Sequence, residues 1–69
     1  MFENAQKIKA NIDLIQNDEL VNHIGYAFVV NQKIVGVLYS SCEIPLSGFK
    51  RWKIQRVSVK SNDEWLQWR

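Results

Sequence analysis

Two runs of β-branched and aromatic residues flank Asn31-Gln32 in residues 24–40, IGYAFVVNQKIVGVLYS. Two such runs separated by a two-residue turn predict a β-hairpin. Gln is a weaker residue at the second turn position than the Gly that a type I′ turn prefers. If the turn has two residues, Val30 lies opposite Lys33, and the register of every later pair follows from this one.

This register predicts two unlike faces on the hairpin. One face carries the aromatic side chains Tyr26, Phe28 and Tyr39, and the other has Ala27 opposite Gly36 at its centre. Small residues allow another backbone to come close, so we expect an N-terminal helix to pack on this second face. The aromatic face must then be covered by the C-terminal segment or by a partner.

The segment before the hairpin has a helical pattern. Ala5, Ile8, Ile12 and Ile15 recur at spacings of three and four, which predicts one apolar helix stripe. Asn4 is a good N-cap residue, and Asn17-Asp18 is a break, so the predicted helix runs from about residue 4 to residue 16.

After the hairpin, residues 40–48 are predicted as a loop that contains Pro45 and Gly48, and a third strand is predicted from about residue 50 to residue 60. The alternation of apolar and polar residues breaks inside this strand. Trp52 and Ile54 are at even positions and Val57 and Val59 are at odd ones, so a regular strand would point the two pairs to opposite faces. A bulge near Gln55-Arg56 would return both pairs to one face.

The tail, residues 61–69, has two interpretations. Its Ser61-Asn62-Asp63-Glu64 resembles a capping box and predicts a short helix, and the alternative is a fourth strand over residues 65–69. The predicted fold class is therefore α+β in one small domain, residues 1–69. An N-terminal helix packs on a three-stranded antiparallel sheet, made of the hairpin and the bulged third strand, with a short C-terminal helix or a fourth strand.

The chain offers little catalytic chemistry. Its one His, His23, and one Cys, Cys42, cannot form a closed zinc site, and neither has a local activating neighbour. We therefore expect no catalytic residue, no metal, no cofactor and no enzymatic activity. A single Cys favours a reducing, cytoplasmic setting. The longest apolar run, residues 26–30, is far too short for a membrane span, so no membrane partner is expected.

Charge and aromatic residues concentrate toward the C-terminus. The net charge is +2, yet residues 50–69 hold six cations and two acids, whereas residues 1–23 hold two cations and four acids. All three Trp residues also lie in the last third of the chain. Rings beside cations are typical of surfaces that hold a partner.

The leading hypothesis is a non-catalytic protein-binding module, for example a small phage or mobile-element inhibitor or modulator of a host protein complex. More aromatic area than a small sheet can cover motivates it. The residues expected to bind the protein partner are Tyr26, Tyr39, Arg51, Trp52, Arg56, Trp65 and Trp68.

Two alternatives stay open. In the first, the chain is a small nucleic-acid-binding protein in which the strand over residues 50–60 places cations on phosphates and a ring on a base. The cations of that alternative are Lys50, Arg51, Lys53, Arg56 and Lys60. In the second, the chain is a homo-oligomer that associates through its aromatic face or its sheet edges.

Overall fold

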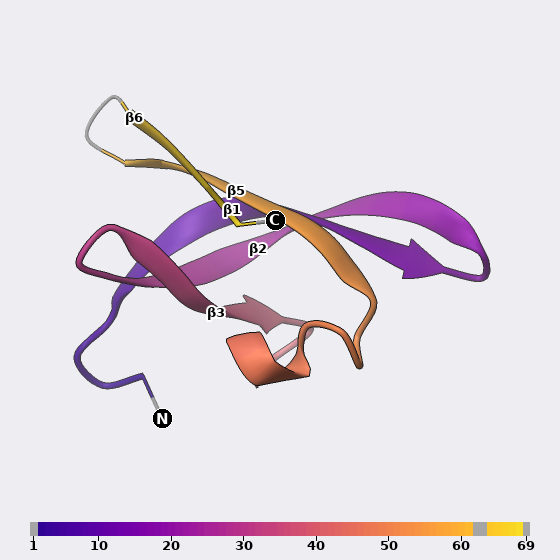
Figure 1. The fold of residues 1–69 in the computed structure, drawn as a ribbon, viewed down its shortest axis with the longest axis horizontal. Helices are drawn as coiled ribbons and strands as arrows, with labels where there is room; N and C mark the ends of the chain where they lie inside the picture. The colour runs from indigo at the N-terminus through magenta and orange to yellow at the C-terminus, as the bar shows by residue number, and fades with distance from the viewer. Residues whose placement is uncertain (1, 62–63, 69) are drawn as a thin grey trace.

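The structure, a computed structural model, describes residues 2–61 and 64–68. All of its strands belong to one antiparallel sheet in the order β4-β3-β2-β1-β5-β6 (Figure 1). Neighbours in sequence are neighbours in the sheet, except that β5 returns to pair with β1. The elements are β1 (Gln6–Gln16), β2 (Glu19–Val30), β3 (Lys33–Tyr39), β4 (Cys42–Pro45), the 3₁₀ helix η1 (Leu46–Gly48), β5 (Ile54–Ser61) and β6 (Glu64–Trp68).

The predicted N-terminal helix is wrong, because residues 6–16 form the strand β1. Ile8, Ala10, Ile12 and Leu14 alternate along it and point to the core, where the last three are at most 4% exposed. Strand β1 pairs with β2 along its whole length and with β5 over residues 10–14, so the backbone at its centre has partners on both edges. The described residues contain no α-helix, and the α+β class is corrected to an all-β antiparallel sheet.

Three two-residue turns connect the first four strands. Asn17-Asp18, Asn31-Gln32 and Ser40-Ser41 have φ between 50° and 65° at both positions, as a type I′ turn requires. The turn predicted at Asn31-Gln32 is confirmed, and Val30 lies opposite Lys33. The loop predicted over residues 40–48 is wrong for its first half, which turns tightly into β4.

A bulge in β3 changes the rest of the predicted hairpin register. Val29 lies opposite Ile34, but the next pair joins Phe28 to Gly36, so Val35 is the extra residue. Ala27 consequently lies opposite Val37 rather than Gly36. Beyond the bulge, every β3 side chain lies on the face opposite to the one predicted. This fills the core and separates Tyr39 from Tyr26 and Phe28.

The bulge predicted in the third strand is confirmed. Asp13 pairs with Arg56 and Leu14 pairs with Ile54, which leaves Gln55 as the extra residue. Ile54 therefore shares the buried face with the valines of β5. The strand begins at Ile54 rather than residue 50, because residues 50–53 form a turn closed by hydrogen bonds such as Lys53 N to Lys50 O.

The predicted short C-terminal helix is also wrong, and the strand alternative agrees with β6. Its residues alternate, with Leu66 and Trp68 packed against the core and Trp65 exposed at 61%. Two residues of the predicted capping box, Asn62 and Asp63, lie outside the described residues, as do Met1 and Arg69.

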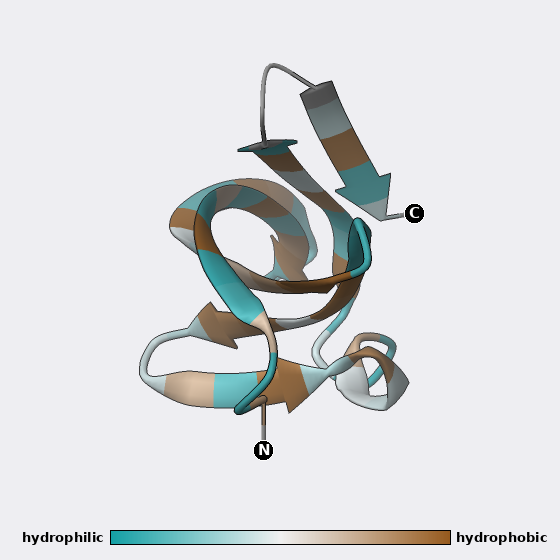
Figure 2. Ribbon diagram, turned by 90° about the vertical axis from the view of Figure 1, so that its left-hand side faces the viewer, coloured by the Kyte–Doolittle hydropathy of each residue, from teal (hydrophilic) through white to brown (hydrophobic). Residues whose placement is uncertain are grey.

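The sheet curls strongly into an incomplete ring around one core (Figure 2), and β3 comes into contact with β6. Phe49 is only 1% exposed and fills the interior of the curled sheet. Its aromatic ring meets that of Trp68 edge to face, at 4.7 Å between centroids. On the outside, Phe2 stacks on Phe28 at 4.5 Å and lies over Gly36. The N-terminal segment, not the C-terminal one, thus covers Phe28. Within the described residues, no helix has the length and apolar character needed to cross a membrane.

Candidate binding surfaces

The first candidate surface is the outer sheet face, the side of β2, β1, β5 and β6 that points away from the core. Residues that alternate with the buried ones point to this side. Four of them are large, apolar and open to solvent: Leu20 at 63%, Ile24 at 66%, Tyr26 at 42% and Trp65 at 61% exposed. The outer sheet face is therefore the region where the chain leaves most apolar side-chain surface uncovered.

Strand register joins these residues across the sheet. Lys9 of β1 lies opposite Tyr26, and Lys60 of β5 lies opposite Trp65. Ile24 and Trp65 border one hollow of about 370 Å³, with Lys9 and Lys60 between them. Two apolar groups and two ammonium groups thus share one recess that crosses four strands.

A second hollow, of about 580 Å³, lies toward the β1–β2 turn of the same face. It is lined by Leu20, Ile15 and Asp13 from the hairpin and by Arg56 and Gln67 from β5 and β6. Figure 1 shows that the β1–β2 hairpin extends beyond the other strands. The Asp13 carboxylate accepts a 2.6 Å hydrogen bond from Asn22, which holds it within its own hairpin.

Cations surround the apolar residues of the outer sheet face. The Nζ atom of Lys7 lies 5.2 Å from the centroid of the Tyr26 ring, in the range of a cation–π contact. Lys9, Arg56 and Lys60 are also exposed, in strands whose buried residues point the other way. This mixture of rings, aliphatic groups and cations can bind a partner that has apolar groups and carboxylates.

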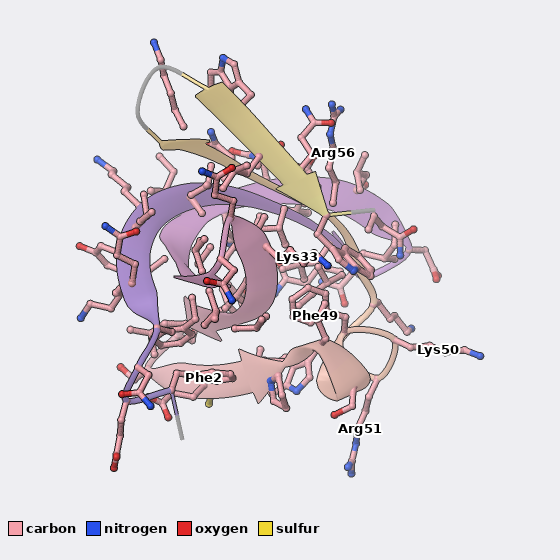
Figure 3. The ribbon with its side chains drawn as sticks, turned by 60° about the vertical axis from the view of Figure 1, so that its left-hand side comes forward. Phe2, Lys33, Phe49, Lys50, Arg51 and Arg56 are labelled. Atoms are coloured by element: carbon pink, nitrogen blue, oxygen red, sulfur yellow. The ribbon has the colours of Figure 1, made fainter. Side chains whose placement is uncertain are left out.

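The second candidate surface is the Trp52 hollow, a recess of about 540 Å³ at one end of the curled sheet. Gln16, Tyr39, Arg51, Trp52 and Lys53 line it. Figure 3 shows Lys50 and Arg51 projecting from the turn after η1, away from Arg56 beside β6. The cations of the two surfaces therefore project on different sides of the molecule, while Ile15 borders both the Trp52 hollow and the second hollow of the outer sheet face.

Aromatic and polar contacts fix the residues around the Trp52 hollow. The Tyr39 ring meets Trp52 edge to face at 6.2 Å and His23 at 4.9 Å between centroids. The Tyr39 hydroxyl lies 3.4 Å from His23 Nε2, which also lies 3.2 Å from Gln16 Oε1. His23 is thus one member of a structural aromatic and polar cluster.

The residues predicted to bind a protein partner do not form one site. Tyr26, Arg56 and Trp65 lie on the outer sheet face, whereas Tyr39, Arg51 and Trp52 lie at the Trp52 hollow. Trp68 is half-buried against Phe49 and belongs to the core. The cations proposed for nucleic acid divide in the same way: Lys50, Arg51 and Lys53 lie in the turn, and Arg56 and Lys60 lie on β5.

Sequence reasoning missed the largest contributors to the outer sheet face, Leu20 and Ile24, and also Lys7 and Lys9. The alternation in residues 7–14 is the signal that could have found the lysines, since it puts them opposite the buried residues of β1. No comparable signal marks Ile24, because an apolar residue at that position fits a core equally well.

Within residues 2–61 and 64–68, no three His, Cys, Asp or Glu side chains gather as ligands for a metal ion. The free thiol of Cys42 is exposed on β4. Comparisons with protein-family models, with curated proteins and with solved structures gave no match.

Proposed function

We propose that this chain is a non-catalytic protein-binding module that docks through its outer sheet face. The observation that carries the proposal is that Leu20, Ile24 and Trp65 are each more than 60% exposed on the same side of one sheet. Several large apolar side chains left exposed on one side of a sheet often mark a protein interface. The partner surface that fits has an apolar centre and an acidic rim.

Trp65 and Tyr26 are the expected anchors of this interface. Their rings contribute large contact area at low cost in side-chain entropy, and Trp, Tyr and Arg are the residues that most often dominate binding energy. They project from paired strands, so the backbone that presents them needs little ordering when the partner binds.

The charge of the face selects the partner. Lys7, Lys9, Arg56 and Lys60 flank the apolar residues, so a surface with carboxylates at its rim is favoured over a basic one. Charges at a rim mainly raise the association rate and exclude partners of like charge. We therefore expect binding to weaken modestly, and not to vanish, when the salt concentration rises.

A module of this kind acts on its partner by occupying a surface. We accordingly propose that it inhibits or modulates the protein it binds. A cytoplasmic location suits the exposed single thiol of Cys42, which a reducing compartment would keep free.

The test is differential capture followed by measured affinity. Wild-type protein, Trp65→Ala and the control Leu46→Ala are immobilised and exposed to a nuclease-treated extract of the cell that expresses the chain. Leu46 is a suitable control because it is 39% exposed but lies in η1, away from the outer sheet face. A protein retained by wild type and control but lost with Trp65→Ala is then purified for calorimetry.

The expected result is a dissociation constant raised roughly 30-fold by Trp65→Ala, which corresponds to a hot spot of about 2 kcal/mol. Leu46→Ala should leave it unchanged. Equal affinity of all three proteins contradicts the proposal. A dimer of the chain that Trp65→Ala dissociates in sedimentation equilibrium also contradicts it, because the face then belongs to a second copy.

A further inference from the structure

We propose that the Trp52 hollow binds a nucleotide, with its base stacked on the Trp52 indole and its phosphate between Arg51 and Lys53. The inference concerns the Trp52 hollow rather than the outer sheet face, and it does not depend on protein docking there. It rests on three properties of the hollow: a partly exposed indole, cationic side chains beside it, and an ordered backbone that presents both.

Part of the Trp52 side chain is open to the hollow. Trp52 is 39% exposed and lines the recess, and the Tyr39 ring meets the indole edge to face at 6.2 Å between centroids. Every nucleic-acid base has a π-face, so stacking on an exposed aromatic residue is a general way to hold a base. The volume of about 540 Å³ is within the usual range for small-molecule sites.

The charged residues that line the hollow are both cations. Arg51 and Lys53 flank Trp52 in sequence, and both are exposed. An Arg guanidinium can bind a phosphate through two parallel hydrogen bonds, and a Lys ammonium supplies a compact charge. Gln16 brings an amide group to the same rim, where it can meet the edge of a base.

The backbone of the turn is held at both ends. Trp52 N donates to Gly48 O at 3.1 Å, and Ile54 N donates to Phe49 O at 2.9 Å. The Lys53 carbonyl accepts from Ile15 N at 3.0 Å, which ties the turn to β1. Because Phe49 is buried in the core, the backbone that carries Arg51, Trp52 and Lys53 is ordered before a nucleotide arrives.

Lys53 has a backbone conformation that is unusual for its residue type. Its φ is 60°, in the left-handed region that Gly adopts freely and Lys does not. Strained residues of this kind often occur at ligand sites. The strain also provides a useful variant, because Lys53→Gly removes the cation and relieves the backbone at the same time.

One ligand chemistry here has two sources, a free nucleotide and a nucleotide within a single strand. The experiment titrates isotope-labelled protein with AMP and, separately, with an oligothymidylate of about ten nucleotides, within the usual site size for one small domain. The readout is the indole N–H signal of each Trp, assigned with the variants Trp52→Ala and Trp65→Ala.

The expected result is a shift of the Trp52 indole signal with at least one of the two probes. Trp52→Ala should weaken that binding about ten-fold, and Lys53→Gly should weaken it without lowering the thermal midpoint. Trp65→Ala is the matched control and should bind as wild type does. Oligothymidylate binding that is much tighter than AMP binding and falls steeply with salt identifies a strand, whereas equal affinities identify the free nucleotide.

Two results would overturn the inference. The first is an unchanged Trp52 signal with millimolar amounts of both probes. The second is nucleotide binding that Trp65→Ala abolishes and Trp52→Ala does not, since this would move the site to the outer sheet face.

Discussion

Each side of the β1–β2 hairpin carries an isoleucine, and these two side chains have opposite environments. Ile12 on the inner side is completely buried, whereas Ile24 on the outer side is 66% exposed. Ile12 packs with the valines of β5 in the core, and Ile24 borders a hollow with Trp65. Apolar character alone therefore does not say whether a side chain of this sheet serves the fold or a partner.

The comparison assigns separate physical roles to the two sides. Removing apolar area from water stabilises the folded chain only where the chain itself covers that area. The inner side gains this stabilisation on folding, and the outer side would gain it only from the partner that we propose. Substitutions on the inner side should change the free energy of unfolding, and substitutions on the outer side should change binding.

The largest expected effect is on the inner side. Ile12→Ala should lower the free energy of unfolding by about 2–5 kcal/mol, because it removes buried methyl groups and leaves a cavity. A chain of this length has a total of roughly 3–10 kcal/mol, so the variant should lose a large share of its stability. Urea unfolding followed by circular dichroism measures the change. A loss below 1 kcal/mol would mean that Ile12 is not a central core residue.

A smaller effect is expected at Gly25, where β2 comes close to β3. A Cβ atom there would lie 2.5 Å from the Leu38 carbonyl oxygen, so Gly25→Ala must push the two strands apart. We expect a loss of about 1–3 kcal/mol in the free energy of unfolding. Gly48→Ala is the milder comparison, since its nearest contact is the Ile44 Cγ2 methyl group at 3.2 Å, which must shift by only a few tenths of an ångström. Equal stabilities for the two variants would contradict the close strand approach.

Part of this fold could be predicted from the sequence. The turn at Asn31-Gln32 and the bulge at Gln55 both leave a clear local mark, a two-residue break between β-rich runs and a change of parity. Residues 5–15 leave an ambiguous one, because Ala5, Ile8, Ile12 and Ile15 fit a helix while residues 8, 10, 12 and 14 fit a strand. This segment forms a strand because it pairs with β2 on one side and with β5 on the other. Strand β5 is distant in the sequence, so the local residue pattern does not reveal this partner.

The bulge at Val35 could not be predicted in the same way. Residues 34–38 are Ile-Val-Gly-Val-Leu, with no polar residue to mark which face each position takes. If the strand register shifts by one residue within such a run, the sequence pattern does not change, but Tyr39 moves to the other face of the sheet. The predicted aromatic face therefore failed, and with it the grouping of Tyr26 with Tyr39 in one site.

The candidate surfaces were predictable in residue type and not in arrangement. Trp65 and Arg56 are predicted contact residues, because rings and cations are typical of interfaces, and both lie on the outer sheet face. Ile24 and Leu20 look like core residues in the sequence. They lie outside because other side chains fill the inner positions of the sheet.

The most direct test of the central claim is the stability of the double variant Ile24→Ala, Trp65→Ala. Both side chains are more than 60% exposed, so their removal should change the free energy of unfolding by no more than about 1 kcal/mol, as expected for two surface substitutions. Urea unfolding beside the wild-type protein gives the value. A loss of several kcal/mol would show that the outer sheet face holds the fold together and is not reserved for a partner.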